Sequence, residues 1–508
     1  MADDDRQDRA GNDFSRRRML AVASAGIGSS LVKAPAEARP PAAGRTRNVR
    51  DFGAKGDGVT DDTEAFNRAT QADAEWSWDL LSSIIVPAGR YRIAGTVYLR
   101  KGQSLIGEGL STYIDAADVE HSTFIMGRRR GKGRGVEDPG GLPVRIERLM
   151  GLGGTANEGF IFAAIPGFQI SGLFLTAVGI GIEIEAADGI VSDIEIDQCL
   201  NGIVIRKSQN IVLTNLNVFA PNYAISLEGR CWDIAIVNAV FCYTKYVTLL
   251  LGEGAEDITS VSVTNCIFTN NVPYETFQGY IHCRANRSDL LVTGCIFRNA
   301  SGYAIIQGAG SGLSLSLHGC VIDGMRSNPD YNQSLASKGI KTGYGRFSVT
   351  NCSFRHLTSE AIRVGPGLVA LQVEGGSVEE VKGEIIVVEN DPVGPITIRN
   401  MHGLAQVATV GTEHRVTLPW LGSRCRWHVT VNGRDAAAPT SAAQYMVAAG
   451  QKAAVETLWS MGANATAVIS PVAAGSANRS TAGRVMQIRL DARQFGTVAP
   501  VIDALGYA

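Results

Sequence analysis

The feature that most constrains the fold is a short repeat that begins after residue 180. Segments such as Val263-Thr-Asn-Cys266 and Val349-Thr-Asn-Cys352 recur, and nine of them end between residues 199 and 401, at a mean interval of about 25 residues. A second segment type with period-2 alternation lies between them, as in Ala224-Ile-Ser-Leu227. This alternation predicts short strands. A repeat of this length with two or three strands is typical of one rung of a parallel β-helix.

Equivalent positions of such rungs should form columns, because a rung cannot bury its inner residues alone and must stack on its neighbours. Asparagine tolerates left-handed backbone at turns, so a partial asparagine ladder is expected at Asn215, Asn238, Asn265, Asn351 and Asn400. A column of cysteines is expected at the next position, made of Cys199, Cys266, Cys295, Cys320 and Cys352. Neighbouring cysteines could bond, but packing as small buried thiols is favoured.

Residues 49–69 combine a strand, a glycine-rich turn and the start of a helix with one apolar face. Asp61, followed by Glu64 three residues later, resembles an N-terminal capping box. The helix is expected to close the open end of the solenoid, since exposed strand edges need covering. Asp57, Asp61 and Asp62 lack the register of a calcium loop. Calcium binding is therefore compatible with the sequence, but no motif for it is present. Neither a cofactor nor a metal site is predicted.

Three segments together resemble the start of a known superfamily: Val49–Ala69, Ile85–Tyr91 and Leu105–Gly109. They are similar to the pectate-lyase superfamily, and more narrowly to its rhamnogalacturonase/epimerase-like group, which includes phage tailspikes. The likeness is specific over about 49–110 and generic over 170–403. It implies an all-β chain folded as a right-handed, single-stranded parallel β-helix that handles polysaccharides. It does not fix the reaction, because the group contains lyases, hydrolases, epimerases and non-catalytic binders.

The first 38 residues have the layout of an export signal. Ser15-Arg-Arg-Arg18 precedes a mildly apolar stretch over 19–32, and Ala36-Glu-Ala38 is a small-x-small cleavage site. The paired arginines resemble the bacterial twin-arginine signal. We therefore expect residues 1–38 to be cleaved after passage through the twin-arginine translocase, which leaves a periplasmic or secreted protein. Residues 39–403 would form the β-helix, and residues 404–508, where the repeat fades, a small β-rich accessory module.

Charge and hydropathy exclude two classes of partner. The formal net charge of −2 argues against a nucleic-acid binder, which normally carries a strong basic excess. The chain has no apolar run of about 18 residues, so no membrane span is expected. The expected partner is a polysaccharide substrate, and an oligomer is compatible with the sequence.

The second segment type is the candidate for the sheet that faces the substrate. Alternation points one isoleucine of each segment inward, which gives Ile203, Ile225, Ile281, Ile305, Ile340 and Ile362. The outward set is then Val204, Ser226, Thr248, His282, Ile306, Lys341 and Arg363. The longest insertion, between Cys320 and Cys352, enters one of these strands, and insertions in a solenoid often gather on the binding face.

Two chemistries compete for these residues. A lyase or epimerase acting on a uronic acid needs a base and positive charge for the enolate, which Lys341, Arg363 and His282 could supply. A glycoside hydrolase needs two carboxylates, for which Asp330 with Glu360 or Asp323 is the candidate pair. Paired aspartates at a rung turn are absent, which favours the lyase or epimerase; non-catalytic glycan binding is the third alternative. Substrate contacts are expected from Tyr274, Glu275, Tyr303, Asp323, Arg326, Tyr331, Arg355 and His356.

Two further features can be interpreted either as substrate-binding or as ordinary surface structure. The basic run 128–134 could contact an acidic polysaccharide, or it could be a solvated loop. Tyrosines recur near the turns and could stack on sugar rings, although tyrosine is common at β turns; these are Tyr223, Tyr246, Tyr274, Tyr303 and Tyr331.

Overall fold

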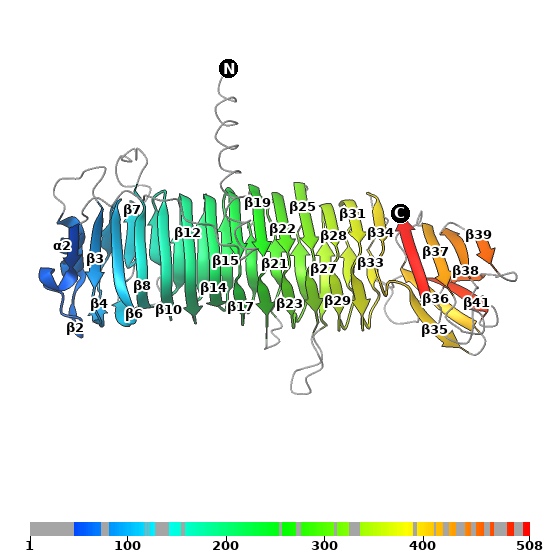
Figure 1. Ribbon diagram of the computed structural model, residues 1–508, viewed down its shortest axis with the longest axis horizontal. Helices are drawn as coiled ribbons and strands as arrows, with labels where there is room; N and C mark the ends of the chain where they lie inside the picture. The colour runs from blue at the N-terminus through cyan, green and yellow to red at the C-terminus, as the bar shows by residue number, and fades with distance from the viewer. Residues whose placement is uncertain are drawn as a thin grey trace, which may run out of the picture.

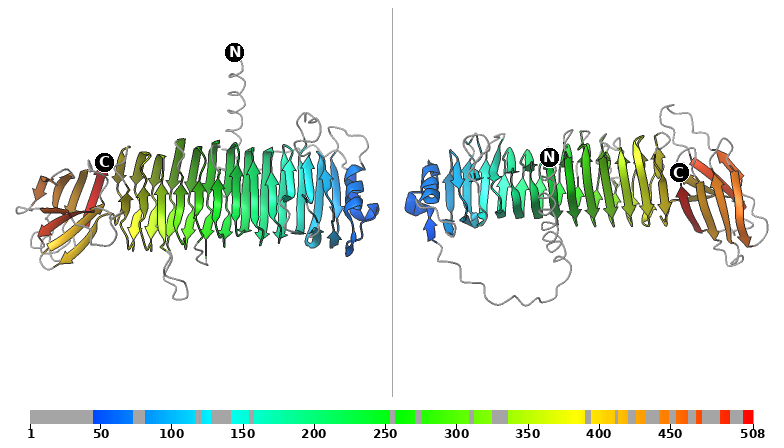
Figure 2. Two further views of the ribbon diagram at one scale, coloured as in Figure 1. Left: turned by 180° about the vertical axis from the view of Figure 1, so that it is seen from behind. Right: turned by 90° about the horizontal axis from the view of Figure 1, so that it is seen from above.

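The protein, described here by a computed structural model, is a long solenoid of parallel strands followed by a group of antiparallel strands (Figure 1). Views from behind and from above show α2 at one end of the solenoid and the C-terminal strands at the other (Figure 2). The described residues are 45–72, 81–116, 119, 121–127, 142–153, 158–252, 257–270, 276–308, 312–324, 336–389, 394–410, 413–419, 426–432, 442–448, 454–461, 468–471, 485–491 and 501–507.

A rung of the solenoid has three strand segments that each pair in parallel with the same segment of the next rung. In one rung these are β19 (Asp257–Thr264), β20 (Ile267–Thr269) and β21 (Gly279–Cys283). They pair with β22 (Arg287–Thr293), β23 (Ile296–Arg298) and β24 (Tyr303–Gln307). The first two segments of every rung belong to one large sheet and the third to a twelve-stranded sheet. This arrangement confirms the predicted all-β fold and is consistent with a right-handed parallel β-helix.

The twelve-stranded sheet carries the candidate site. Its other strands are β5 (Val97–Leu99), β7 (Phe124–Gly127), β9 (Gly159–Ala164), β11 (Ile180–Ile184), β13 (Asn201–Arg206), β15 (Tyr223–Glu228), β18 (Val247–Leu251), β27 (Lys338–Thr342), β30 (Ile362–Val364) and β33 (Ile386–Val388).

The large sheet of 26 strands wraps the other two sides of the solenoid. Its remaining solenoid strands are β1 (Arg45–Asn48), β2 (Asp57–Asp61), β3 (Ser82–Val86), β4 (Gly89–Arg92), β6 (Gln103–Ala116), β8 (Val144–Gly153), β10 (Phe168–Thr176), β12 (Ala187–Asp197), β14 (Gln209–Phe219), β16 (Cys231–Val237), β17 (Val240–Cys242), β25 (Gly312–His318), β26 (Val321–Asp323), β28 (Gly345–Thr350), β29 (Ser353–Arg355), β31 (Leu368–Glu374), β32 (Ser377–Glu379) and β34 (Ile396–Arg399).

A column of left-handed residues bends each rung between its first and second segments. The predicted asparagine ladder is confirmed here, because all five asparagines have positive φ; glycine, aspartate or, in one rung, Arg148 takes the same position elsewhere. The Asn215 side chain donates to Asp193 Oδ1 of the preceding rung at 3.0 Å. Left-handed backbone suits Asn, Asp and Gly better than other residues, so the repeat's polar position sets the bend.

The cysteine column directly follows this bend, but it has four members rather than five. Cys266, Cys295, Cys320 and Cys352 each precede the second segment of their rung, and those segments are in register. The prediction that Cys199 belongs to the column is wrong, because Cys199 follows the left-handed Gln198 at the next bend. All eight cysteines of the described residues are free thiols.

The predicted inward isoleucines line the core, and each is at most 1% exposed. The outward set is in register as predicted except at one rung. Ser226 aligns with Leu250 and Leu250 with His282, so Leu250 replaces Thr248 in the outward column. Thr248 lies two residues before Leu250 on the same face of β18, and both side chains are buried.

The N-terminal helix α2 (Thr63–Gln71) follows a short 3-10 turn, η2 (Val49–Phe52). Its N-cap residue is Asp62, so the prediction of Asp61 at that position is wrong by one residue. Asp61 Oδ1 still accepts the amide of Thr63 at 3.0 Å. The Asp62 carboxylate instead accepts the amides of Lys55 and Gly56, at 2.7 and 3.0 Å, and fixes the glycine turn.

The C-terminal strands are antiparallel and join the end of the solenoid. β42 (Val501–Tyr507) pairs with β34 and with β37 (Arg426–Asn432), which continues to β38 (Ala442–Ala448) and β39 (Ala454–Met461). A second sheet contains β35 (Gln406–Val410), β36 (Glu413–Pro419), β40 (Val468–Pro471) and β41 (Val485–Asp491).

No helix of the described residues is long and apolar enough to span a membrane.

Candidate active site

The outward column of the twelve-stranded sheet brings three predicted catalytic residues into one line: the cations Lys341 and Arg363 and the base His282. His282 aligns with Ile306, Ile306 with Lys341, and Lys341 with Arg363. Neighbouring strands are about 4.8 Å apart. Lys341 and Arg363 are therefore direct neighbours, and His282 lies about 10 Å from Lys341 across the apolar Ile306. All three side chains are half-buried.

Glu360 is the centre of a polar cluster beside this column. The hydroxyls of Tyr303 and Ser359 donate to its two carboxylate oxygens. Arg363 Nε donates to Glu360 Oε1 at 2.6 Å, and Lys338 Nζ lies 3.9 Å from the same oxygen. The Glu360 side chain is only 4% exposed. Both of its oxygens are thus committed to protein partners.

These contacts fix the charge state of the cluster. Burial would raise the pKa of Glu360, but hydrogen bonds from Arg363, Ser359 and Tyr303 outweigh burial and lower the pKa to about 2. Burial disfavours the charged form of Arg363, yet Glu360 raises the pKa of Arg363 above its usual value. Arg363 Nη1 also lies 3.3 Å from Glu389 Oε1. Arg363 is therefore a guanidinium held between two carboxylates.

Glu384 occupies the turn one rung beyond Glu360, because Ile362 and Ile386 are paired. Burial and the nearby negative charge of Glu360 raise the pKa of Glu384. Two carboxyl groups in neighbouring rungs thus differ in how readily they hold a proton. Sequence reasoning missed Glu384 and Glu389, although the interval between Glu360 and Glu384 is close to one repeat.

His282 differs from the cations in having no partner for one ring nitrogen. Its Nδ1 is buried and forms no hydrogen bond within the described part of the chain. Burial, with a smaller contribution from Arg284, lowers the pKa of His282 to about 4. The imidazole is therefore neutral at neutral pH and can accept a proton.

Three predicted substrate-binding residues form a separate cluster at the end of β26 and β29. Arg355 Nε donates to Asp323 Oδ2 at 3.1 Å, and His356 Nδ1 lies 2.7 Å from Asp323 Oδ1. His356 Nε2 is 3.7 Å from Glu380. No described contact joins this cluster to Glu360. Tyr303, in contrast, belongs to the Glu360 cluster.

Several predicted residues lie outside the described part of the chain. They are Tyr274, Glu275, Arg326, Asp330 and Tyr331, together with the export signal at 1–38 and the basic run at 128–134. The roles assigned to them stay predictions.

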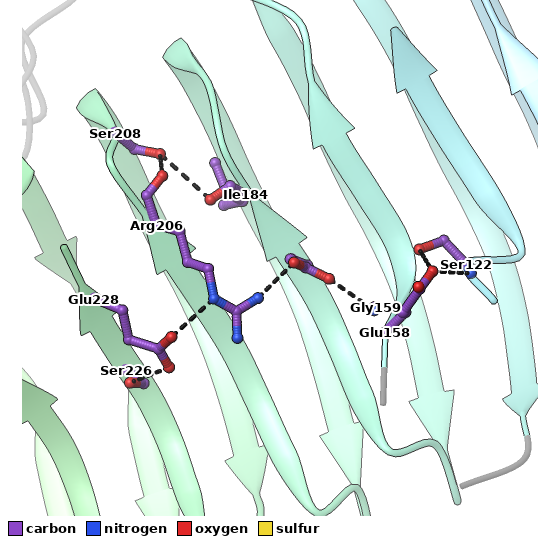
Figure 3. A network of polar contacts seen from close by, with 9 residues as sticks. Ser122, Glu158, Gly159, Ile184, Arg206, Ser208, Ser226 and Glu228 are labelled. Carbon is purple, nitrogen blue, oxygen red and sulfur yellow. Dashed lines mark hydrogen bonds and ion pairs between the residues drawn. The ribbon is translucent and has the colours of Figure 1, made fainter. Parts of the chain in front are cut away.

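A second charged network on the same sheet escaped the sequence analysis. Figure 3 shows Arg206 between two carboxylates: it bonds Glu183 on one side and Glu228 Oε2 at 2.8 Å on the other. Glu228 also accepts from Ser226 at 3.0 Å. The network continues through the Gly159 amide, which donates to Glu183 at 3.1 Å. Every charged group in it is already paired, so the network ties rungs together.

Metal ligation has no basis in the part of the chain that the structure describes. No group of three or more His, Cys, Asp or Glu side chains there could hold a metal ion. The N-terminal aspartates, which resembled a calcium loop in composition, accept backbone amides instead; Asp57 Oδ1 accepts those of Val59 and Thr60 at 2.9 and 2.8 Å.

Comparison with curated proteins gives partial matches. A glucan 1,3-β-glucosidase of Cochliobolus carbonum is 44% identical over 252 residues, which cover 44% of this chain and 32% of that protein. Alginate lyase 7 of Azotobacter vinelandii is 31% identical over 130 residues, which cover 24% of this chain and 15% of that protein. The chain therefore spans about a third of the length of the glucosidase and less of the lyase.

Comparison with solved structures gives matches of low sequence identity. A Family 28 exopolygalacturonase of Yersinia enterocolitica is 14% identical, covering 72% of this chain and 82% of that one, with a TM-score of 0.42. The surface adhesin PfbA of Streptococcus pneumoniae is 17% identical, covering 73% and 96%, with a TM-score of 0.47.

The N-terminal rungs match a described family. Residues 46–141 match the family described as rhamnogalacturonase A/epimerase, pectate lyase-like. This match falls on the segments from which the resemblance was drawn, and the stacked parallel strands extend the same architecture through the rest of the solenoid. The chain is therefore a parallel β-helix protein whose N-terminal rungs match the rhamnogalacturonase A/epimerase, pectate lyase-like family.

Proposed function

We propose that this protein is an exported lyase or epimerase that acts on an acidic polysaccharide. The observation that carries the proposal is the outward column in which Lys341 and Arg363 are direct neighbours and a neutral His282 lies two strands away. Lys341 forms no ion pair with a described residue, so its charge is available to an anion. The paired arginines before residue 19 support export, and the partial likeness to an alginate lyase supports an acidic substrate.

In the proposed reaction, the carboxylate of a uronic acid lies against Lys341 and Arg363. His282 removes the proton on the carbon α to that carboxylate, and the two cations stabilise the enolate that forms. In a lyase, the electron pair then forms a carbon–carbon double bond as the glycosidic oxygen on the next carbon leaves and takes up a proton. In an epimerase, the same carbon is reprotonated from its opposite face. The substrate carboxylate also favours the protonated imidazole.

Glu360 has a positioning role in this proposal. Its oxygens are occupied by Arg363, Tyr303 and Ser359, and its side chain is nearly inaccessible. It therefore holds the Arg363 guanidinium at the column instead of contacting the sugar.

Elimination can be tested on a panel of polyuronates by the ultraviolet absorbance of the unsaturated product, and epimerisation by NMR of the polymer. We expect turnover by the wild-type chain and its loss in Lys341→Ala and His282→Asn. Arg346→Ala, an exposed cation on the large sheet, is the matched control and should retain activity. Unchanged turnover in both Lys341→Ala and His282→Asn would refute the assignment. Binding without any chemical change would favour the non-catalytic alternative.

A second candidate function is glycoside hydrolysis, and the raised pKa of Glu384 favours it. A carboxyl group that keeps its proton can act as the general acid, with an ionised carboxylate as its partner. The likeness to a glucan 1,3-β-glucosidase supports this candidate. New reducing ends without unsaturation, released from a neutral β-1,3-glucan and lost in Glu384→Gln, would establish hydrolysis in place of elimination.

A further inference from the structure

The turns that lead into the strands of the twelve-stranded sheet stack as a leading corner, which we define by Tyr223, Tyr246, Gln278, Tyr303 and Lys338. We propose that the leading corner binds an acidic polysaccharide in an extended form, through two tyrosine rings, Tyr246 and Tyr303, that each have an ammonium group beside them. This inference deepens the proposed function, because it takes its acidic substrate from there.

The five residues follow one another rung by rung. Tyr223 aligns with Val247, so Tyr246 lies one residue before the equivalent position of the next rung. The amide of Gln278 donates to the carbonyl of Tyr246 at 2.8 Å. Tyr303 is in register with Lys338. At about 4.8 Å a rung, the leading corner extends over about 20 Å along the solenoid axis.

Two positions on the corner repeat the same pair of groups. Lys245 Nζ lies 5.5 Å from the centroid of the Tyr246 ring, and Lys338 Nζ lies 4.9 Å from that of Tyr303. The two tyrosines are half-buried and sit two rungs apart, which corresponds to about 10 Å. A half-buried ring offers apolar area at low conformational cost. An ammonium has three donors, so Lys338 can donate to an anion beside its 3.9 Å contact with Glu360 Oε1.

Positive charge continues between these two units. Gln278 is exposed, and its Oε1 accepts from Arg284 Nη2 at 2.5 Å, which holds the Arg284 guanidinium next to the corner. Lys245 is exposed and forms no ion pair with a described carboxylate. A chain with a carboxylate on its sugars would meet Lys245, Arg284 and Lys338 in turn, while a neutral chain would gain nothing from them.

The leading corner is continuous with the proposed reaction site. Lys338 and Lys341 belong to the same strand, β27, and are about 10 Å apart at the rise of an extended chain. Tyr303 bonds Glu360, which holds Arg363. Tyr246 and Lys245 therefore form a remote subsite that only a substrate of several sugars can reach from Lys341. Short oligomers should bind without using it.

The test measures Kd by calorimetry for polygalacturonate and alginate oligomers of two lengths, in a Lys341→Ala background so that substrate is not consumed. We expect Tyr246→Ala to weaken binding of the long oligomers at least tenfold and to leave the short ones unchanged. Lys245→Glu, a change at an exposed residue, should weaken long oligomers similarly and serves if the tyrosine variant is unstable. Tyr113→Ala is the matched control, because Arg90 lies 5.0 Å from the Tyr113 ring in the first rungs, far from the corner.

Three results would overturn the leading corner as a binding site. The first is an unchanged Kd for long oligomers in both Tyr246→Ala and Lys245→Glu. The second is a failure of the Lys341→Ala chain, in which these changes are made, to bind either polyuronate. The third is an affinity for neutral laminarin equal to that for the polyuronates. The proposed reaction fails separately: binding that depends on Tyr246, without elimination or epimerisation by the wild-type chain, would refute the reaction and support the corner. Turnover by the wild-type chain with equal KM for long and short substrates, unchanged in Tyr246→Ala, would support the reaction and refute the corner.

Discussion

Glu360→Gln should reveal how much the cluster around Arg363 contributes to stability. Burial leaves the Glu360 carboxylate 4% exposed, and its partners lower its pKa from 4.5 to about 2. Each pKa unit between the folded and unfolded states is worth about 1.4 kcal/mol, so the ionised form stabilises the folded chain by about 3 kcal/mol. Glutamine keeps the shape, but it removes the charge and replaces one acceptor oxygen with an NH2 donor. The variant should therefore lose about 3 kcal/mol at neutral pH.

The pH dependence has a definite sign. A carboxyl group whose pKa is lowered by folding stabilises the protein fully above its unfolded pKa, and this stabilisation disappears as the pH falls through the folded pKa. The difference between wild type and Glu360→Gln should be constant above about pH 5 and shrink to near zero at about pH 2.

Urea unfolding at a series of pH values, followed by circular dichroism, measures this difference. Glu380→Gln is the control, because Glu380 is 79% exposed and its contact with His356 is 3.7 Å; surface ion pairs are worth about 0–1 kcal/mol. A difference that stays the same from pH 7 to pH 2 would mean that lost packing, and not lost charge, explains the variant. A loss below about 1 kcal/mol at neutral pH would contradict the whole argument.

Four further expectations follow from particular contacts. Since the pKa of His282 is lowered to about 4, its NMR titration midpoint should lie near 4, and kcat/KM should stay on a plateau above that pH instead of falling below pH 6.5. The cysteine column should resist alkylation in the native chain and react after denaturation, as peptide mass mapping will show; labelling of native Cys320 would contradict its burial. Gly376→Ala should lower the melting temperature more than Gly109→Ala. Both glycines have positive φ, but only a Cβ at Gly376 would meet the carbonyl oxygen of Cys352, at 2.0 Å. Lys341→Gln should raise the melting temperature of the substrate-free chain, because it removes one of two like charges in neighbouring strands; a drop would mean that Lys341 is structurally paired.

The sequence predicted the rung and most of its columns, because both depend on local rules. Period-2 alternation sets which residues face inward, and the left-handed bend selects Asn or Gly at one position of each rung. Counting along these rules placed Lys341 next to Arg363 correctly. It failed by two residues in one strand: Leu250, not Thr248, aligns with Ser226. Cys199 was misplaced for a different reason, because it follows the next bend of its rung and not the bend that precedes the other cysteines.

The Glu360 cluster was only half visible in the sequence. Glu360 stood out because it precedes a predicted strand, and Arg363 because it is the outward residue of that strand. Glu384 and Glu389 belong to the next rung and have no motif of their own. Contacts between rungs join residues about 25 positions apart, and the exact partner depends on turn lengths that alternation does not specify. The same limit concealed Arg206, whose partners Glu183 and Glu228 lie in the rungs on either side.

The two arginine clusters show why Lys341 is informative. In a solenoid, side chains at equivalent positions of adjacent rungs are held about 4.8 Å apart, so a charged residue must be matched by its vertical neighbours or face repulsion. Arg206 and Arg363 each meet this requirement with two carboxylates. Lys341 does not: its neighbours in the outward column are the apolar Ile306 and the like-charged Arg363. The outward arginines of this sheet are thus paired with carboxylates, whereas Lys341 is left open to an anion. The carboxylate of an acidic sugar would supply its missing partner.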